Sequence, residues 1–158
     1  MDFSWTDQQK EFREQIVEFS KRELNDDLVT REQKSLFSHV GWQRCADFGI
    51  QGLANPAKYG GRYEEVDILT SVLAMEGFGY GCYDNGLAFA LNAQMWTVQL
   101  PIVQFGSDAQ KQKYLPKFAN GDWIGCHALT EIDNGSDVFN MKMSAQRCDG
   151  GYILNGQK

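Results

Sequence analysis

The segment from Ala128 to Asp137 holds the residues of this sequence best suited to binding a ligand. It joins a predicted strand end to a polar loop that carries the Thr130 hydroxyl, the Ser136 hydroxyl and the unhindered backbone at Gly135. Hydroxyls and backbone amides in such a loop can bind a polar or anionic group. An ordinary turn rich in Asn and Asp would produce the same pattern, and the residues alone favour that turn.

Three carboxylates lie in the same segment, at Glu131, Asp133 and Asp137. Neighbouring carboxylates can exchange protons with a substrate or bind a hard cation. Their spacing does not match an EF-hand loop, and no histidine lies at ligand spacing from them. We therefore interpret them as solvated loop carboxylates and predict no metal site.

Cysteine chemistry is not expected here. Cys126 and His127 are neighbours on a predicted strand, and neighbouring strand residues point to opposite faces, so the two cannot act as a nucleophile pair. The cysteines are widely spaced, without a Cys-x-x-Cys pair, which is typical of free thiols in a reducing compartment. They are Cys45, Cys82, Cys126 and Cys148.

The glycine-rich patch Gly77-Phe78-Gly79-Tyr80-Gly81 superficially resembles a phosphate-binding loop. It lacks a Gly-x-Gly-x-x-Gly pattern after a strand and lies between helical segments, so we interpret it as a helix–helix turn. The large aromatic residues are interpreted as the core of a helical bundle rather than as a stacking surface. They are Trp42, Phe48, Phe89, Trp96, Phe105 and Phe118.

Apolar residues at helical spacing predict five helices ahead of the candidate segment. They cover residues 6–26, 35–47, 63–78, 85–104 and 107–119. Thr6 with Gln9, and Ser107 with Gln110, have the form of capping boxes that begin a helix. Residues 25–34 are interpreted as a polar stretch, and residues 50–62 as a loop rich in Gly and Pro.

Two helices carry further expectations. In the second, an inward face is predicted with a stop at Gly49. That face comprises Leu36, Phe37, Val40 and Ala46. The fourth is apolar nearly all round, which predicts burial, and Pro101 predicts a kink or an early end.

Strand patterns replace helical ones after Gly121. Residues 123–129 and 141–148 are predicted strands, and Asp149-Gly150-Gly151 predicts a hairpin turn to a return strand at 152–154. Helices followed by strands predict an α+β multidomain fold. We place an all-α helical bundle at residues 1–121 and the start of a β domain at 122–158, cut after its first strands.

Composition limits the class of protein. The 158 residues are 42% hydrophobic and 23% charged, which is typical of a globular chain. The net charge of −6 argues against nucleic acid and against an acidic membrane surface as partners. No apolar run is long enough to cross a membrane, and the start shows no signal-like pattern, so a cytoplasmic location is expected.

Five stretches resemble, in order, the N-terminal part of the acyl-CoA dehydrogenase family of flavoproteins. They are Phe3-x-x-Thr6-x-x-Gln9; Gly52-Leu53 through Pro56-x-x-Tyr59-Gly60-Gly61; Phe105-Gly106-Ser107 with Gln110-Lys111-x-Lys113-Tyr114-Leu115-Pro116; Leu129-Thr130-Glu131-x-x-x-Gly135-Ser136-Asp137; and Gly151-Tyr152-x-Leu154-Asn155-Gly156-x-Lys158. The resemblance implies a helical domain, a β-barrel-like middle domain and a C-terminal helical domain, the last of which is absent here.

The resemblance also implies a reaction, the α,β-dehydrogenation of an acyl thioester. A glutamate would take the α-proton while the β-hydride passes to flavin N5. In most of the family that glutamate lies in the C-terminal helices, so we assign no catalytic base in this segment, neither Glu76 nor Glu131.

The cofactor implied is FAD, and the family's flavin contacts correspond to five positions of this chain. They are His127, Leu129, Thr130, Gly135 and Ser136. Ser136 would also approach the thioester-bearing arm of the substrate. This implication reverses the preference for an ordinary turn at this loop.

Several alternatives stay open at this stage. The acyl or aminoacyl group could be carried by CoA or by an acyl or peptidyl carrier protein. The electrons could pass to an electron-transfer flavoprotein or, in an oxidase, to oxygen. A non-catalytic interaction module that keeps the dehydrogenase-like fold is a further alternative. Family members are usually homotetramers, so a homo-oligomer is expected.

Overall fold

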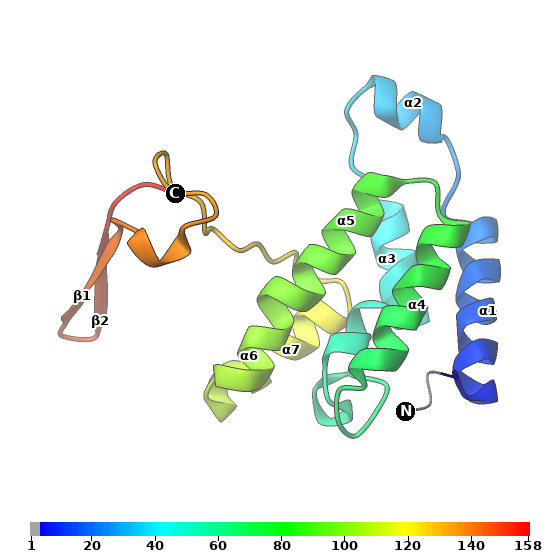
Figure 1. The fold of residues 1–158 in the computed structure, drawn as a ribbon, viewed down its shortest axis with the longest axis horizontal. Coiled ribbons are helices and arrows are strands. Elements are labelled where there is room, and N and C mark those ends of the chain that lie inside the picture. Colours follow the sequence, from blue (N-terminus) through cyan, green and yellow to red (C-terminus); the bar gives the residue numbers. More distant parts are fainter. Residues whose placement is uncertain (1–3) are drawn as a thin grey trace. The chain divides into compact units, whose positions relative to one another are not determined.

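The computed structural model describes residues 4–158, so Phe3 of the first family-like motif lies outside the described residues. The chain divides into two compact units, a helical one that runs to Cys126 and a smaller one from His127 to Lys158. Figure 1 shows both. Helices followed by an antiparallel strand pair confirm the predicted order of elements.

The first helix, α1 (Asp7–Glu23), begins where the sequence predicts. The Thr6 hydroxyl accepts the amide of Gln9, and the Gln9 side chain accepts the amide of Thr6, which completes the capping box. Its inward face includes Phe12, Ile16 and Phe19. These side chains join the hydrophobic core of the unit.

The stretch after α1 differs from the prediction. It contains a short helix, α2 (Leu28–Gln33), none of whose residues is buried. The next helix, α3 (His39–Phe48), begins at the Ser38 cap and ends at Gly49, whose φ of 95° suits glycine. The predicted inward face is wrong, because Leu36, Phe37 and Val40 are exposed. The buried residues of α3 are Gly41, Trp42 and Cys45.

The breaker-rich loop contains two 3-10 turns, Gln51–Ala54, which is buried throughout, and Ala57–Tyr59, in which only Tyr59 is buried. Helix α4 (Ile68–Gly81) follows and includes the whole glycine-rich patch, so the interpretation of that patch as a helix–helix turn is wrong. The helix continues because it packs along α1 (Figure 1), where a small side chain is needed. A Cβ at Gly81 would lie 2.5 Å from the Val17 carbonyl oxygen.

The glycines of α4 give a test of this packing. Gly81→Ala is expected to destabilise the fold by about 1–3 kcal/mol, because its Cβ would also lie 2.7 Å from Ser20 Cβ. At Gly79, a Cβ would meet nothing within 4 Å among residues 4–158 beyond the backbone of its own helix, so Gly79→Ala is expected to stabilise the helix by about 0.5–1 kcal/mol. Urea unfolding of the two variants measures both changes. Changes of the same sign would contradict the packing.

The predicted fourth helix is divided into three parts. They are α5 (Asn85–Ala93), a π-helix (Gln94–Gln99) and α6 (Leu100–Phe105). Pro101 lies in the first turn of α6, where a proline needs no hydrogen-bond partner for its nitrogen. Helix α7 (Asp108–Ala119) begins at the predicted capping box. Phe89 and Phe105 are 75% and 89% exposed, so their assignment to the core is wrong.

The second unit contains one antiparallel hairpin. Strand β1 (Ser144–Cys148) pairs with β2 (Gly151–Asn155), and Gly150 at the turn has a φ of 81°. The hairpin confirms the prediction, but residues 123–129 form no strand. Among residues 4–158, no helix has both the length and the apolar character needed to cross a membrane.

Candidate functional site

The donor-rich loop of the second unit is built around a tight turn. The amide of Glu131 donates to the Asn134 carbonyl at 3.0 Å, and the amide of Asn134 donates back to the Glu131 carbonyl at 3.2 Å. The Asn134 side chain donates to the carbonyl of Asn140 at 2.9 Å. These bonds close the loop on itself before the hairpin begins.

Glu131 holds this loop to the start of the hairpin. Its carboxylate accepts the amide of Lys142 at 2.7 Å and the amide of Met143 at 2.9 Å. The Lys158 ammonium lies 3.1 Å from the same carboxylate and donates to the Leu129 carbonyl at 2.8 Å. Glu131 is only 8% exposed, so its interpretation as a solvated loop carboxylate is wrong.

The hydrogen bonds of Glu131 determine its ionisation. The amides of Lys142 and Met143, followed by Lys158, stabilise the charged form and lower the pKa of the Glu131 carboxyl to about 2. A carboxylate ionised at every physiological pH is unsuited to act as a general acid or base. In this structure the Glu131 carboxylate holds the loop against the start of the hairpin through these two amides.

The other two carboxylates of the loop are exposed, as predicted. Asp133 pairs with the Lys142 ammonium at 2.5 Å, and Asp137 accepts a hydrogen bond from the side chain of Asn140. Within residues 4–158, no cluster of three or more His, Cys, Asp or Glu side chains could hold a metal ion. The cysteines are free, with Cys45 and Cys82 buried, and burial raises the pKa of the Cys45 thiol well above its usual range.

The predicted ligand-binding residues all lie on the surface of this loop. His127, Leu129, Thr130, Gly135 and Ser136 are exposed. Within residues 4–158, the backbone amides of Thr130, Gly135 and Ser136 donate no hydrogen bond. Nothing in the same range lies within 4 Å of a Cβ built at Gly135. A donor set that is held in shape but has no protein partner can bind an anionic or carbonyl-bearing group.

A residue missed by the sequence reasoning is Lys158. It belongs to the Gly-x-Lys end of a family-like motif, and the motif itself implies no role for it. Its side chain is 16% exposed and joins Leu129 to Glu131, two positions of the candidate loop. A lysine placed three residues beyond a strand end gives no local signal of such a contact, because the partners lie more than 25 residues away.

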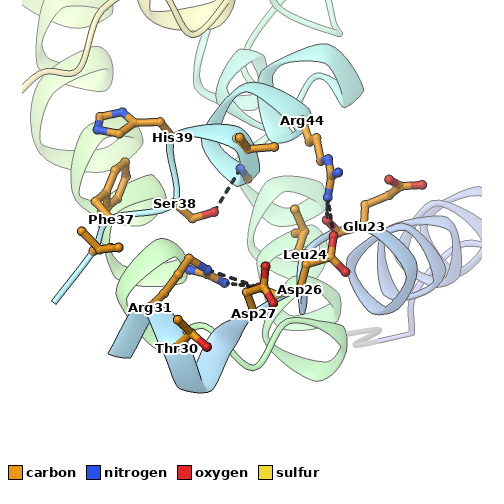
Figure 2. Close-up of a pocket in the computed structure, with 13 residues that line it drawn as sticks. Glu23, Leu24, Asp26, Asp27, Thr30, Arg31, Phe37, Ser38, His39 and Arg44 are labelled. Atoms are coloured by element: carbon orange, nitrogen blue, oxygen red, sulfur yellow. Dashed lines mark hydrogen bonds and ion pairs between the residues drawn. The ribbon is translucent and has the colours of Figure 1, made fainter. Parts of the chain in front are cut away.

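A cavity of about 570 Å³ lies in the helical unit, between the end of α1, α2 and the start of α3. Figure 2 shows its arginines already engaged: Arg44 binds the Asp26 carboxylate at 3.0 Å, and Arg31 donates to the Asp26 carbonyl. Ser38 accepts the Gly41 amide. Because these cations are occupied, they stabilise the fold rather than offer free donors.

The comparisons with known proteins identify the family. The sequence matches the family described as "Acyl-CoA dehydrogenase, N-terminal domain" over residues 6–122. The chain therefore belongs to the acyl-CoA dehydrogenase family.

Two curated relatives illustrate the range of that family. The chain is 37% identical over 158 residues to the L-prolyl-[peptidyl-carrier protein] dehydrogenase of a Serratia species, covering all of this chain and 40% of the relative. It is 34% identical over 154 residues to the mitochondrial isovaleryl-CoA dehydrogenase of Oryza sativa subsp. japonica, covering 96% of this chain and 37% of the relative.

Solved structures agree in fold. The prolyl acyl carrier protein oxidase AnaB superposes with a TM-score of 0.90 at 44% identity, covering 97% of this chain and 40% of AnaB. The structure described as PigA with FAD and proline superposes with a TM-score of 0.91 at 36% identity, covering 99% of this chain and 40% of the PigA chain. The chain thus spans about 40% of the length of these relatives.

Proposed function

We propose that this chain belongs to an FAD-dependent enzyme that dehydrogenates an acyl thioester, and that the acyl group is a prolyl group held on a carrier protein. The sequence similarity supports this choice of substrate. Identity reaches 44% with the prolyl carrier protein oxidase and 37% with the prolyl-carrier dehydrogenase, against 34% with the isovaleryl-CoA enzyme.

The loop of the second unit fits the flavin in its donor chemistry. The free amides of Thr130, Gly135 and Ser136 and the two hydroxyls suit the carbonyl-bearing ring edge and the pyrophosphate of FAD. His127 and Leu129 would also contact FAD, and Ser136 would in addition approach the thioester arm of the substrate. When bound, FAD would accept the hydride from the β-carbon of the substrate.

The residues of this chain would bind and orient rather than exchange protons. Glu131 keeps the loop amides in place, and its lowered pKa keeps its carboxylate charged at every physiological pH. The base that takes the α-proton is proposed to lie outside these 158 residues. We propose a helical domain at residues 1–121 and the start of the β domain at 122–158, a homotetrameric assembly, and an electron-transfer flavoprotein or oxygen as the electron acceptor.

A direct test uses the full-length protein loaded with FAD. The carrier-bound prolyl thioester is expected to bleach the flavin absorbance at least about tenfold faster than isovaleryl-CoA under anaerobic single-turnover conditions. Reoxidation by oxygen, compared with an electron-transfer flavoprotein, separates an oxidase from a dehydrogenase. Faster bleaching by isovaleryl-CoA would overturn the choice of carrier.

The same experiment tests the reaction itself. Retention of FAD without bleaching by either thioester would overturn the dehydrogenation. A protein that binds no flavin at all would favour the non-catalytic interaction module.

A further inference from the structure

We propose that Gln94 is a positioning residue for the flavin loop, because it anchors the backbone just before that loop begins. The inference rests on the proposed function for its consequence, but its geometry lies entirely within the helical unit. The residue anchored is Gly125, and the candidate loop starts two residues later at His127.

The anchor is a part-buried hydrogen bond to a buried side chain. The side-chain oxygen of Gln94 accepts the amide of Gly125 at 2.8 Å, and the Gln94 side chain is fully buried. Its amide nitrogen lies 3.5 Å from the carbonyl oxygen of Phe118 near the end of α7. Loss of the acceptor would leave the part-buried Gly125 amide and the rest of the buried Gln94 site without this bond, so the bond favours one backbone position.

The packing around Gly125 favours the same position. A Cβ built there would lie 2.8 Å from Val98 Cγ1 and 3.1 Å from the Phe118 ring. Glycine is therefore needed for the backbone to come close enough to reach Gln94. Four residues earlier, the Trp42 indole donates to the carbonyl of Gly121 at 3.2 Å, so the chain is held at two points before it leaves the helical unit.

The π-helix explains how Gln94 comes to point at this segment. Gln94 and Val98 both belong to Gln94–Gln99, the single π-helical stretch of residues 4–158. A π-helical turn holds an extra residue, which shifts the directions of the side chains relative to a regular helix, and such turns are frequent at functional sites. Here it directs both the Gln94 side-chain oxygen and the Val98 side chain towards Gly125.

Gln99 offers a matched control. It lies in the same π-helix and is also fully buried, but it donates to the Gln51 carbonyl at 2.8 Å and to the Asn55 side chain at 2.9 Å. Gln94→Met and Gln99→Met therefore each remove one side-chain amide at a fully buried position. Only the first affects the backbone that leads into the loop.

The experiment compares full-length wild type with Gln94→Met, Gly125→Ala and Gln99→Met. We expect the first two variants to raise the FAD dissociation constant by about tenfold or more and to alter the visible circular dichroism of the bound flavin. Gln99→Met should lower thermal stability and leave both flavin readouts within about twofold of wild type. If Gln94→Met does not fold, Gly125→Ala decides the question.

Hydrogen exchange of the flavin-free protein separates this inference from the proposed function. Faster exchange at residues 123–137 in Gln94→Met and Gly125→Ala, but not in Gln99→Met, is expected whether or not the protein binds FAD. A wild type that binds no FAD would contradict the proposed function alone. Unchanged exchange in the first two variants, or equal loss of FAD affinity in all three, would overturn the positioning role.

Discussion

Glu131→Ala is expected to raise the FAD dissociation constant of the full-length protein roughly tenfold to a hundredfold and to increase hydrogen exchange across residues 129–143. The substitution leaves the amides of Lys142 and Met143 without an acceptor and the Lys158 ammonium without its counter-ion. These groups join the loop to the hairpin, so their loss should move apart the donors that we propose bind the flavin.

Asp133→Ala provides the matched control for Glu131. Its carboxylate lies two residues away in the same loop but is exposed, and it pairs with the Lys142 ammonium. Exposed pairs of this kind contribute little to stability, so FAD affinity should stay within about twofold of wild type. Equal losses in the two variants would show that negative charge near the flavin, rather than the amide contacts, is what matters.

Acid should affect the loop through the same carboxylate. The pKa of Glu131 falls from its ordinary value of 4.5 to about 2 in the folded chain, so its stabilising contribution is fully present above pH 4.5. That contribution is lost progressively as the pH falls from 4.5 towards 2. Hydrogen exchange at Lys142 and Met143, corrected for intrinsic rates, should therefore show constant protection between pH 7 and 5. Protection lost already at pH 6 would contradict the lowered pKa.

Arg31→Met is expected to destabilise the helical unit by about 3–5 kcal/mol, because it leaves the Asp84 carboxylate buried and unpaired. Side-chain exposure is 16% for Arg31 and 7% for Asp84. Burial raises the pKa of Asp84, but hydrogen bonds from Arg31 and from the Leu87 and Gly86 amides outweigh it, and the net pKa is lowered. The ion pair connects α2 to the start of α5, where Asp84 is the N-cap.

The double variant Arg31→Met/Asp84→Asn separates the charge from the cap. Asparagine keeps an oxygen for the Leu87 amide and carries no charge, so most of the lost stability should return, leaving a deficit of about 1–2 kcal/mol. Urea unfolding measures both variants. Lys10→Met breaks the exposed pair with Asp7 and should cost less than about 1 kcal/mol. A cost as large for Lys10→Met as for Arg31→Met would contradict the role of burial.

Local sequence signals predicted the helices with clear beginnings. The capping boxes at Thr6 and Ser107 form as expected, since each joins residues three positions apart. The hairpin at Gly150 is likewise local, because its turn needs a left-handed residue that glycine supplies. In such cases the interacting groups are neighbours in the chain, and no distant element is needed to choose the structure.

Tertiary contacts decided the features that the sequence reasoning missed. The glycines of α4 look like helix breakers in isolation, but Gly77 and Gly81 let the helix pack closely against α1. The π-helix at Gln94–Gln99 has no local signature, since its side chains are fixed by contacts with Gly125 and with the Gln51 loop. In both cases packing between elements outweighs the intrinsic preference of a short segment.

The candidate loop shows where the two kinds of information divide. The sequence by itself identified the family, and it predicted the donor residues of the loop, because both depend on residue types in order. Only the tertiary structure showed that Glu131 is buried under two amides and Lys158 rather than solvated. Burial and pKa depend on partners that lie 11 to 27 residues further along the chain, and spacing within the loop does not reveal them.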